Sequence, residues 1–440
     1  MTARPHIPVS HVTAVVIGNA LEFYDFLTYA LYATYIGNAF FPSHNASSRL
    51  LLSLATFGVG FLTRPIGGIA IGRLGDRYGR KPAMLLSFFL MGAGMLGLAL
   101  TPSYAQIGFA APILVLACRL IQGFALGGEV GPSTAYLIEA APPELRGLYG
   151  TMQLTSQRAS TLVAAIVGVA LSSVLSAHAL QDWGWRVAFL LGVAVVPFGL
   201  WIRRNLPETL HAADDAALAP DATRGTLALS SRLRPYLRVI VCGFALLSSA
   251  TIGIYVITYM TTYALNTLHK SAAVSLGVTI VTSLVGVIGH PLSGWLSDRM
   301  GRRPVMILPG LLMIAAILPA FWCIVHFSST LVLYTAMGLV TLLFSLSTAP
   351  TIVALSESVP REIRSGATAT VYAFAISIFG GSAQFLVAWL TDVTGNPLAP
   401  AWYWTAAAAF GIVAMLAMPE SAPVKRRGAS EMTAWDSSFR

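Results

Sequence analysis

The residues best suited to chemistry in this sequence are ionisable side chains that interrupt long apolar stretches. Six of them lie in the first half of the chain: Glu22, Asp25, Arg64, Arg119, Glu129 and Arg158. A charge at bilayer depth is costly unless it faces a cavity or an opposite charge, so each is a candidate for handling an ion or a charged substrate. The apolar stretches of the second half carry only His290, with hydroxyls and amides around it. We expect the first half to handle charge and protons, and the second half to offer neutral hydrogen bonds.

The three acids are candidates for carrying protons. Glu22 and Asp25 are one helical turn apart, and Asn19 and Tyr29 fall on the helical face of Glu22. Two carboxylic acids this close in a medium of low dielectric do not both ionise easily, so one of them would hold a proton. We therefore predict proton coupling by Asp25, Glu22 and Glu129. The alternative is that one acid merely neutralises a buried arginine.

The three arginines are candidates for binding an anion, because a guanidinium offers several donors in one plane that match a carboxylate. Arg119 and Gln122 begin a polar stripe with helical spacing. Arg158, in the middle of an apolar stretch, needs a carboxylate from the protein or from a ligand. Two alternatives stay open. Arg119 could form a structural ion pair with an acid of the first span, and Arg64 could fill the carbonyls freed by Pro65.

Neutral polar residues complete the expected binding set. Tyr255 and Tyr259 lie on one stripe of their helix, although such stripes also arise from simple packing. His290 precedes Pro291 and is predicted to be a partner of the kink, not a proton donor. The residues expected to bind substrate are Arg119, Gln122, Arg158, Gln157, Arg64, Tyr255, Tyr259 and Asn19.

A ten-residue cassette, Gly72–Lys81, recurs as Gly294–Arg303, and proline follows both copies. A second pair of landmarks, Glu139–Arg146 and Glu357–Arg364, repeats in the same order. Matching landmarks in two halves indicate an internal structural repeat, which in a membrane protein is typical of transporters. The residues expected to form a gate are Asp76, Arg77, Arg80, Asp298, Arg299 and Arg302. A purely topological basic loop is the alternative.

The elements that position these residues are predicted to be membrane helices. The chain has 440 residues, of which 56% are hydrophobic and 10% charged, whereas soluble proteins are about 25% charged. Apolar stretches of about 20 residues can span a bilayer. We predict twelve: 12–40, 50–71, 83–101, 107–139, 150–176, 185–204, 236–265, 272–296, 304–327, 330–355, 366–391 and 400–418. The expected protein is an all-α membrane protein with twelve transmembrane helices in two six-helix halves.

The expected division of the chain is a first half at 1–204, a cytoplasmic linker at 205–235, a second half at 236–420 and a cytoplasmic tail at 421–440. With both termini inside, 21 of the 27 Lys and Arg residues fall on the cytoplasmic side, as the positive-inside rule requires. The net charge of +9 therefore reflects topology, and no nucleic-acid partner is expected. No cleavable signal peptide is expected, and Cys118, Cys242 and Cys323 are interpreted as core residues.

The repeated cassette resembles the signature loop of the major facilitator superfamily, and Arg119-Leu-Ile-Gln122-Gly123 resembles a motif of its proton-coupled members. The resemblance implies the major facilitator fold, with each cassette aspartate against the start of a helix from the opposite half. Gly18-Asn19 and Gly60–Gly67 are similar to the metabolite–proton symporter branch, and within it Asp182–Arg186 most resembles bacterial citrate–proton symporters and tricarballylate carriers. Arg158 departs from that pattern, which has a neutral amide at this place.

These observations predict a monomeric secondary active transporter in the bacterial inner membrane that imports a citrate-like di- or tricarboxylate with protons by alternating access. Other substrates on the same framework are dicarboxylates, shikimate, betaine and proline, and a proton-driven efflux antiporter or a non-transporting receptor are further alternatives. No cofactor is expected; the coupling ion is the proton, with sodium as an alternative. No nucleophile–base set, metal cluster or cofactor motif points to an enzyme.

Overall fold

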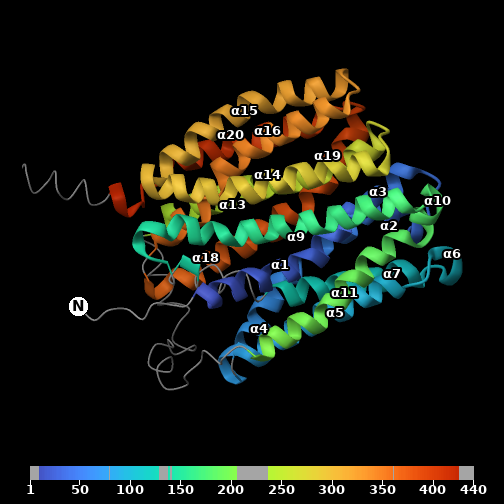
Figure 1. The fold of residues 1–440 in the computed structure, drawn as a ribbon, viewed down its shortest axis with the longest axis horizontal. Helices are drawn as coiled ribbons and strands as arrows, with labels where there is room; N and C mark the ends of the chain where they lie inside the picture. Colours follow the sequence, from blue (N-terminus) through green and yellow to red (C-terminus); the bar gives the residue numbers. More distant parts are fainter. Residues whose placement is uncertain are drawn as a thin grey trace, which may run out of the picture.

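The computed structural model describes residues 9–78, 80–127, 137–138, 141–205, 236–359 and 361–425. Its regular structure within these ranges consists of helices, and most of them run along the long axis of the molecule (Figure 1). The helices of the first half are α1 (Val9–Leu31), α2 (Ala33–Phe40), α3 (Ala46–Val59), α4 (Arg64–Tyr78), α5 (Arg80–Leu100), α6 (Tyr104–Ile107), α7 (Ala110–Leu126), α9 (Arg146–Val174), α10 (Ala177–Ala179) and α11 (Trp185–Asn205). Those of the second half are α13 (Leu237–Asn266), α14 (Ala272–Met300), α15 (Arg302–His326), α16 (Thr330–Thr348), α17 (Thr351–Glu357), α18 (Arg361–Ala375), α19 (Gly381–Thr394) and α20 (Ala399–Ala417).

Helices long enough to span a membrane are found throughout the second half of the chain and in part of the first half. Within the described ranges, eight helical stretches are long and apolar enough to cross a bilayer: Ala46–Ile71, Arg146–Val174, Leu237–Asn266, Ala272–Met300, Arg302–His326, Thr330–Glu357, Thr370–Thr394 and Ala399–Ala417. Two shorter apolar helices are Leu85–Leu100 and Ala110–Leu126. These agree with the predicted spans to within a few residues at most ends. The count of twelve stays a prediction, and nearly all of the expected linker lies outside the described residues.

Several predicted spans consist of more than one helix: 12–40 is divided into α1 and α2, 50–71 into α3 and α4, and 330–355 into α16 and α17. The stretch expected to be one helix over 50–71 breaks between Val59 and Arg64, and Pro65 then stands in the first turn of α4, where its missing N–H costs nothing. The span expected over 107–139 starts too early. Gly108 has a φ of 59°, in the left-handed region that favours glycine, and it separates α6 from α7.

Close helix packing joins the two halves. In Figure 1, α9 of the first half lies beside α14 of the second half over most of its length. A methyl group added at Gly294 on α14 would lie 2.7 Å from the carbonyl oxygen of Gly147 on α9. At the second line of contact, between α3 and α19, a methyl group at Gly381 would lie 2.8 Å from the carbonyl oxygen of Gly58. Glycine therefore allows backbone to approach backbone at both interfaces.

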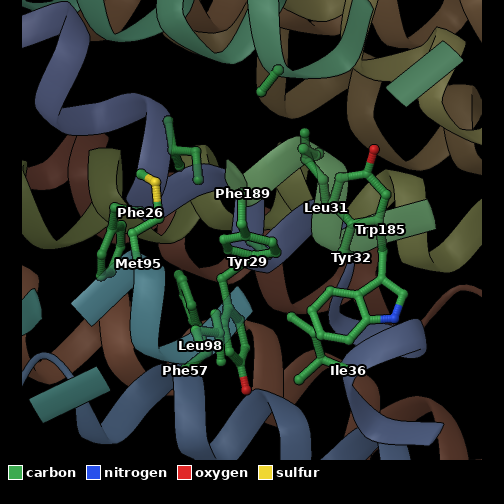
Figure 2. Packing of buried hydrophobic residues seen from close by; sticks show 14 of the residues in the cluster. Phe26, Tyr29, Leu31, Tyr32, Ile36, Phe57, Met95, Leu98, Trp185 and Phe189 are labelled. Carbon is green, nitrogen blue, oxygen red and sulfur yellow. The ribbon is translucent and has the colours of Figure 1, made fainter. Parts of the chain in front are cut away.

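The core of the first half is built around aromatic side chains. Phe26 and Tyr29 of α1 pack on Phe57 of α3, with ring centroids 4.9 and 5.8 Å apart (Figure 2). Phe61, in the break between α3 and α4, meets Phe26 edge to face at 4.9 Å. We call Phe26, Tyr29, Phe57 and Phe61 the aromatic cluster. Because these rings are fully buried, they hold neighbouring charged side chains away from lipid and solvent.

Candidate functional site

A cavity lies where the two halves meet. Its empty space of about 600 Å³ includes its opening to solvent. The first half contributes Phe23, Arg64, Leu154 and Gln157 to its wall. The polar residues from the second half are Thr251, Tyr255, His290, Thr348, Thr351 and Tyr372. One cation and many neutral hydrogen-bonding groups therefore face one another across the boundary between the halves.

Arg64 is the cation of the cavity wall. It begins α4, directly after the break that interrupts the predicted span, and only 5% of it is exposed. Its guanidinium carbon lies 4.2 Å from the ring centre of Phe61 and 4.4 Å from that of Phe26. Within the described part of the chain, its Nε and Nη2 atoms have no hydrogen-bond partner. A buried cation with open donors is costly, and an anionic ligand would satisfy it.

Arg119 lies one layer behind Arg64. It is fully buried on α7, and its guanidinium carbon lies 4.6 Å from the Phe26 ring and 4.5 Å from the Tyr29 ring. Its Nη1 donates to Oε1 of Gln122 over 2.7 Å. Neither Arg119 nor Gln122 belongs to the described cavity wall. The ring of Phe26 therefore contacts both guanidinium groups, one in the wall and one behind it.

Gln157 and Arg158 are neighbours on α9 but face different surroundings. Gln157 lines the cavity, and a side-chain hydrogen bond links it to Tyr372 of α18. Arg158 turns toward α14, where a methyl group added at Gly286 would lie 2.9 Å from its Cγ atom. Adjacent residues of a helix point about 100° apart, and of this pair the cavity wall includes Gln157 but not Arg158. Arg158 is thus part of the contact between the two halves.

Of the neutral residues predicted to bind substrate, the cavity wall includes Tyr255 but neither Asn19 nor Tyr259. The amide of Asn19 donates to Ser156 Oγ over 2.7 Å and to the carbonyl of Gln153 over 3.2 Å. These bonds tie α1 to α9. Tyr259 is buried one turn after Tyr255, in the core of the second half. Tyr255 meets Phe61 edge to face at 5.6 Å, which places it beside Arg64 and the aromatic cluster.

Sequence reasoning assigned no ligand role to two residues of the wall. His290, interpreted as a partner of the Pro291 kink, is 2% exposed and lines the cavity. Tyr372 was not distinguished at all, although Thr368 lies one helical turn before it. Thr348 and Thr351 also lie in the wall.

The acids and the first cassette cannot be compared with the prediction. The backbone of Glu22 and Asp25 belongs to α1 and that of Asp76, Arg77 and Arg80 to α4 and α5, but their side chains lie outside the described part of the structure, as does Glu129 entirely. Their predicted roles in proton coupling and gating stay predictions.

The second cassette makes a direct bond between the halves. Asp298, near the end of α14, accepts hydrogen bonds from the backbone N–H groups of Gly147 over 2.8 Å and Leu148 over 2.9 Å. These residues form the first turn of α9, where the free N–H groups and the helix dipole favour an anion. Arg302 donates to the same carboxylate over 2.7 Å. Arg299 instead stacks on Trp295 at 3.9 Å.

Arg302 connects this contact to the end of the second half. It pairs with Glu357 at the end of α17 through its Nε and Nη2 atoms, over 3.1 and 3.0 Å. Ser421 donates to the same glutamate over 2.9 Å, and Glu420 accepts from the backbone N–H of Arg302 over 2.9 Å. Residues just beyond α20 are therefore bonded to the cassette, and we call the group Asp298, Arg302, Glu357 and Glu420 the latch network.

Helices packed in two groups around a polar cavity, with a bonded latch between the groups, define a membrane transporter. The family model "Sugar (and other) transporter" matches residues 11–432. The chain belongs to this family of the major facilitator superfamily.

Several curated relatives match along nearly the whole chain. A citrate–proton symporter from Klebsiella pneumoniae is 36% identical over 410 residues, covering 92% of this chain and 90% of the relative. An alpha-ketoglutarate permease from Escherichia coli K12 is 35% identical over 414 residues, covering 93% and 92%. A proline/betaine transporter from Salmonella typhimurium is 29% identical, covering 95% and 85%.

Among solved structures, the proton:xylose symporter XylE bound to 6-bromo-6-deoxy-D-glucose superposes with a TM-score of 0.76. It is 20% identical in sequence, and the alignment covers 94% of this chain and 96% of that one. At this identity the likeness concerns the fold alone.

Proposed function

We propose that this protein is a secondary active transporter that imports a di- or tricarboxylate, such as citrate, together with protons. The observation that carries the proposal is Arg64: a buried guanidinium in the cavity wall, with two nitrogen atoms that lack a hydrogen-bond partner among the described residues. A carboxylate is the ligand that fits such a group. The names of the citrate and alpha-ketoglutarate relatives support the same substrate class.

The remaining predicted residues act around this centre. Gln157 and Tyr255 share the cavity wall with Arg64, and Arg119 supports the wall through the Phe26 ring. Glu22, Asp25 and Glu129 load protons from outside. Because protonation removes their repulsion toward an anion, proton and substrate reinforce each other's binding.

Alternating access follows from movement of two six-helix halves, 1–204 and 236–420, within a fold of twelve membrane spans. The latch network stabilises one state, and the cassettes together with both termini lie in the cytoplasm of a bacterium, with the chain in the inner membrane. Proton coupling is favoured over sodium because two of the predicted acids, Glu22 and Asp25, lie one turn apart on one helix.

A symporter for a zwitterion such as betaine or proline is the second candidate. The specific observation in its favour is the ring content of the cavity, where Phe23, Tyr255 and Tyr372 could surround a quaternary ammonium group. Against it stands Arg64, which would repel that group.

Ligand-dependent thermal stability of the purified protein separates the two candidates. A ligand that binds the folded state raises Tm in proportion to the logarithm of its concentration over Kd. We expect citrate, malate, succinate or alpha-ketoglutarate to raise Tm, and betaine and proline to leave it unchanged. A rise with betaine and none with any carboxylate would replace the proposal by the second candidate.

A further inference from the structure

Open groups on the first-half wall of the cavity are donors, whereas two threonines of the second-half wall can only accept, and this difference bears on what the second end of a substrate can be. On the side of the first half, the open groups are donors: Nε and Nη2 of Arg64 and Nε2 of Gln157, which have no partner within the described ranges. Donors of this kind fit an ionised carboxylate, which can only accept.

On the side of the second half, the hydroxyls of two threonines, Thr348 and Thr351, are available only as acceptors. Thr348 Oγ1 donates to the carbonyl of Phe344 over 2.8 Å, and Thr351 Oγ1 donates to the carbonyl of Thr348 over 2.6 Å. A hydroxyl has a single proton, so once that proton is used only the oxygen lone pairs remain for a ligand. An ionised carboxylate placed against these oxygens would find repulsion instead of hydrogen bonds.

His290 lies in the same wall. It stands on α14 and is 2% exposed, and its Nδ1 atom is buried without a hydrogen-bond partner among the described residues. A neutral imidazole has one nitrogen that accepts and one that donates. A buried polar atom with no partner costs free energy, which a ligand group placed there would recover.

We propose that His290, together with Thr348 and Thr351, binds a hydrogen-bond-donating group of the substrate, and that His290 thereby determines substrate specificity. The chemistry is an O–H group, supplied by a hydroxyl or by a protonated carboxyl, while Arg64 and Gln157 bind an ionised carboxylate of the same molecule. The inference rests on the proposed function and deepens it. The substrate is a hydroxy acid, or a polycarboxylic acid bound with one carboxyl protonated, and it connects the two halves when bound.

The test compares three four-carbon acids that differ at one group. Malate carries a hydroxyl, succinate carries none, and succinamate has an uncharged amide that donates like a protonated carboxyl. Binding to the purified full chain is measured by isothermal calorimetry at a pH at which all free carboxyls are ionised. We expect malate or succinamate to bind roughly tenfold more tightly than succinate, as one net hydrogen bond would give. A preference for malate would identify the donating O–H group as a hydroxyl. A preference for succinamate would identify it as a protonated carboxyl.

Variants of the protein show which residues cause this preference for a donating group. His290→Leu is expected to reduce the tenfold preference to about onefold, and His290→Asn, which keeps a polar group near the position of Nδ1, to restore most of it. Thr351→Val is expected to reduce the preference independently, so the inference stays testable if His290→Leu does not fold. Ser293→Ala is the control: Ser293 is also on α14 and buried, but it donates to the carbonyl of Leu346 and is outside the cavity wall.

Two results would overturn the inference. The first leaves the proposed carboxylate transport intact, and the second excludes it too. If the wild type binds the three acids equally, or if His290→Leu and Thr351→Val both keep the preference, the inference is wrong while carboxylate transport stands. If the wild type binds none of these acids and neither citrate nor alpha-ketoglutarate, the proposed function fails as well.

Discussion

The carboxylate of Asp298 accepts a hydrogen bond from the backbone N–H of Gly147, although the two residues belong to opposite halves of the molecule. The bond joins the end of α14 to the first turn of α9, so it exists only while these helix ends are together. Any motion that separates the halves at this end must break it. Asp298 is not part of the cavity wall, so we expect it to act on the balance between conformations and not on substrate contact.

The first prediction follows from this bond. Asp298→Asn should slow net uptake into proteoliposomes severalfold while substrate affinity changes much less, because a charge-assisted bond of about 1.5–3 kcal/mol is lost from one conformation only. Arg299→Gln is the control, since Arg299 stacks on Trp295 and is not bonded to α9 in the structure. Equal uptake rates in wild type and Asp298→Asn would contradict the prediction. Asp76→Asn, in the other cassette, is expected to act in the same direction.

The second prediction concerns the buried cation of the cavity. Arg64→Gln should weaken carboxylate binding by an order of magnitude or more, yet leave Tm without ligand unchanged or higher, because it removes a buried charge with open donors. Arg186→Gln should do the reverse: Arg186 donates to the carbonyls of Ala99 and Thr101, so its loss lowers Tm without affecting ligand binding. Calorimetric titration and thermal unfolding of both variants check the contrast. Unchanged affinity in folded Arg64→Gln would remove the basis of the proposed function.

The third prediction concerns energy coupling. If Glu22 and Asp25 carry protons, a pH gradient that is acidic outside should drive uptake, and an uncoupler should abolish it. Glu22→Gln or Asp25→Asn should end accumulation against a gradient but preserve exchange of substrate between two filled sides, since exchange needs no net proton release. The idea fails if both variants still accumulate substrate, or if a sodium gradient alone drives uptake at equal pH.

The fourth prediction concerns the contact between Arg158 on α9 and Gly286 on α14. In Gly286→Ala the new methyl group would lie 2.9 Å from Arg158 Cγ, so the side chain or the helix must shift. We expect a stability loss of about 1–3 kcal/mol, as in other overpacked interiors, with reduced uptake. In the control Gly338→Ala, the nearest atom is 3.4 Å away, an ordinary contact, so stability should be kept. A Gly286→Ala protein as stable and active as the wild type would show that this interface is not tightly packed.

The sequence indicated the repeat, the helical class and most span ends, because these depend on local hydrophobicity and on two matching cassettes. It could not rank the polar residues by distance from the cavity. Asn19 and Gln157 looked equivalent, yet Asn19 bonds to Ser156 and Gln157 lies in the wall. Which face of a helix meets the cavity depends on how the helices pack together. That packing is determined by residues that lie far apart in the sequence.

The interruptions of helices and the isolated polar residues were harder still to predict from the sequence. The interruption at Gly60–Thr63 sets the direction of Arg64, but glycine and proline in an apolar stretch are also compatible with a continuous kinked helix. Thr368 lies one helical turn before Tyr372, but this one pair did not mark a cavity-facing surface, and Tyr372 lines the cavity where α18 packs against α13.

The contact of Gly58 with Gly381 has a consequence for evolution and for library screening. Since backbone meets backbone there, this position has no side chain that could change its rotamer to absorb a mutation, and even alanine would act as a wedge between α3 and α19. A saturation library selected for growth on the transported compound should therefore be depleted of nearly every substitution at these two glycines, including those that leave the amount of protein in the membrane unchanged. Such a pattern would reveal a moving contact surface through genetics alone.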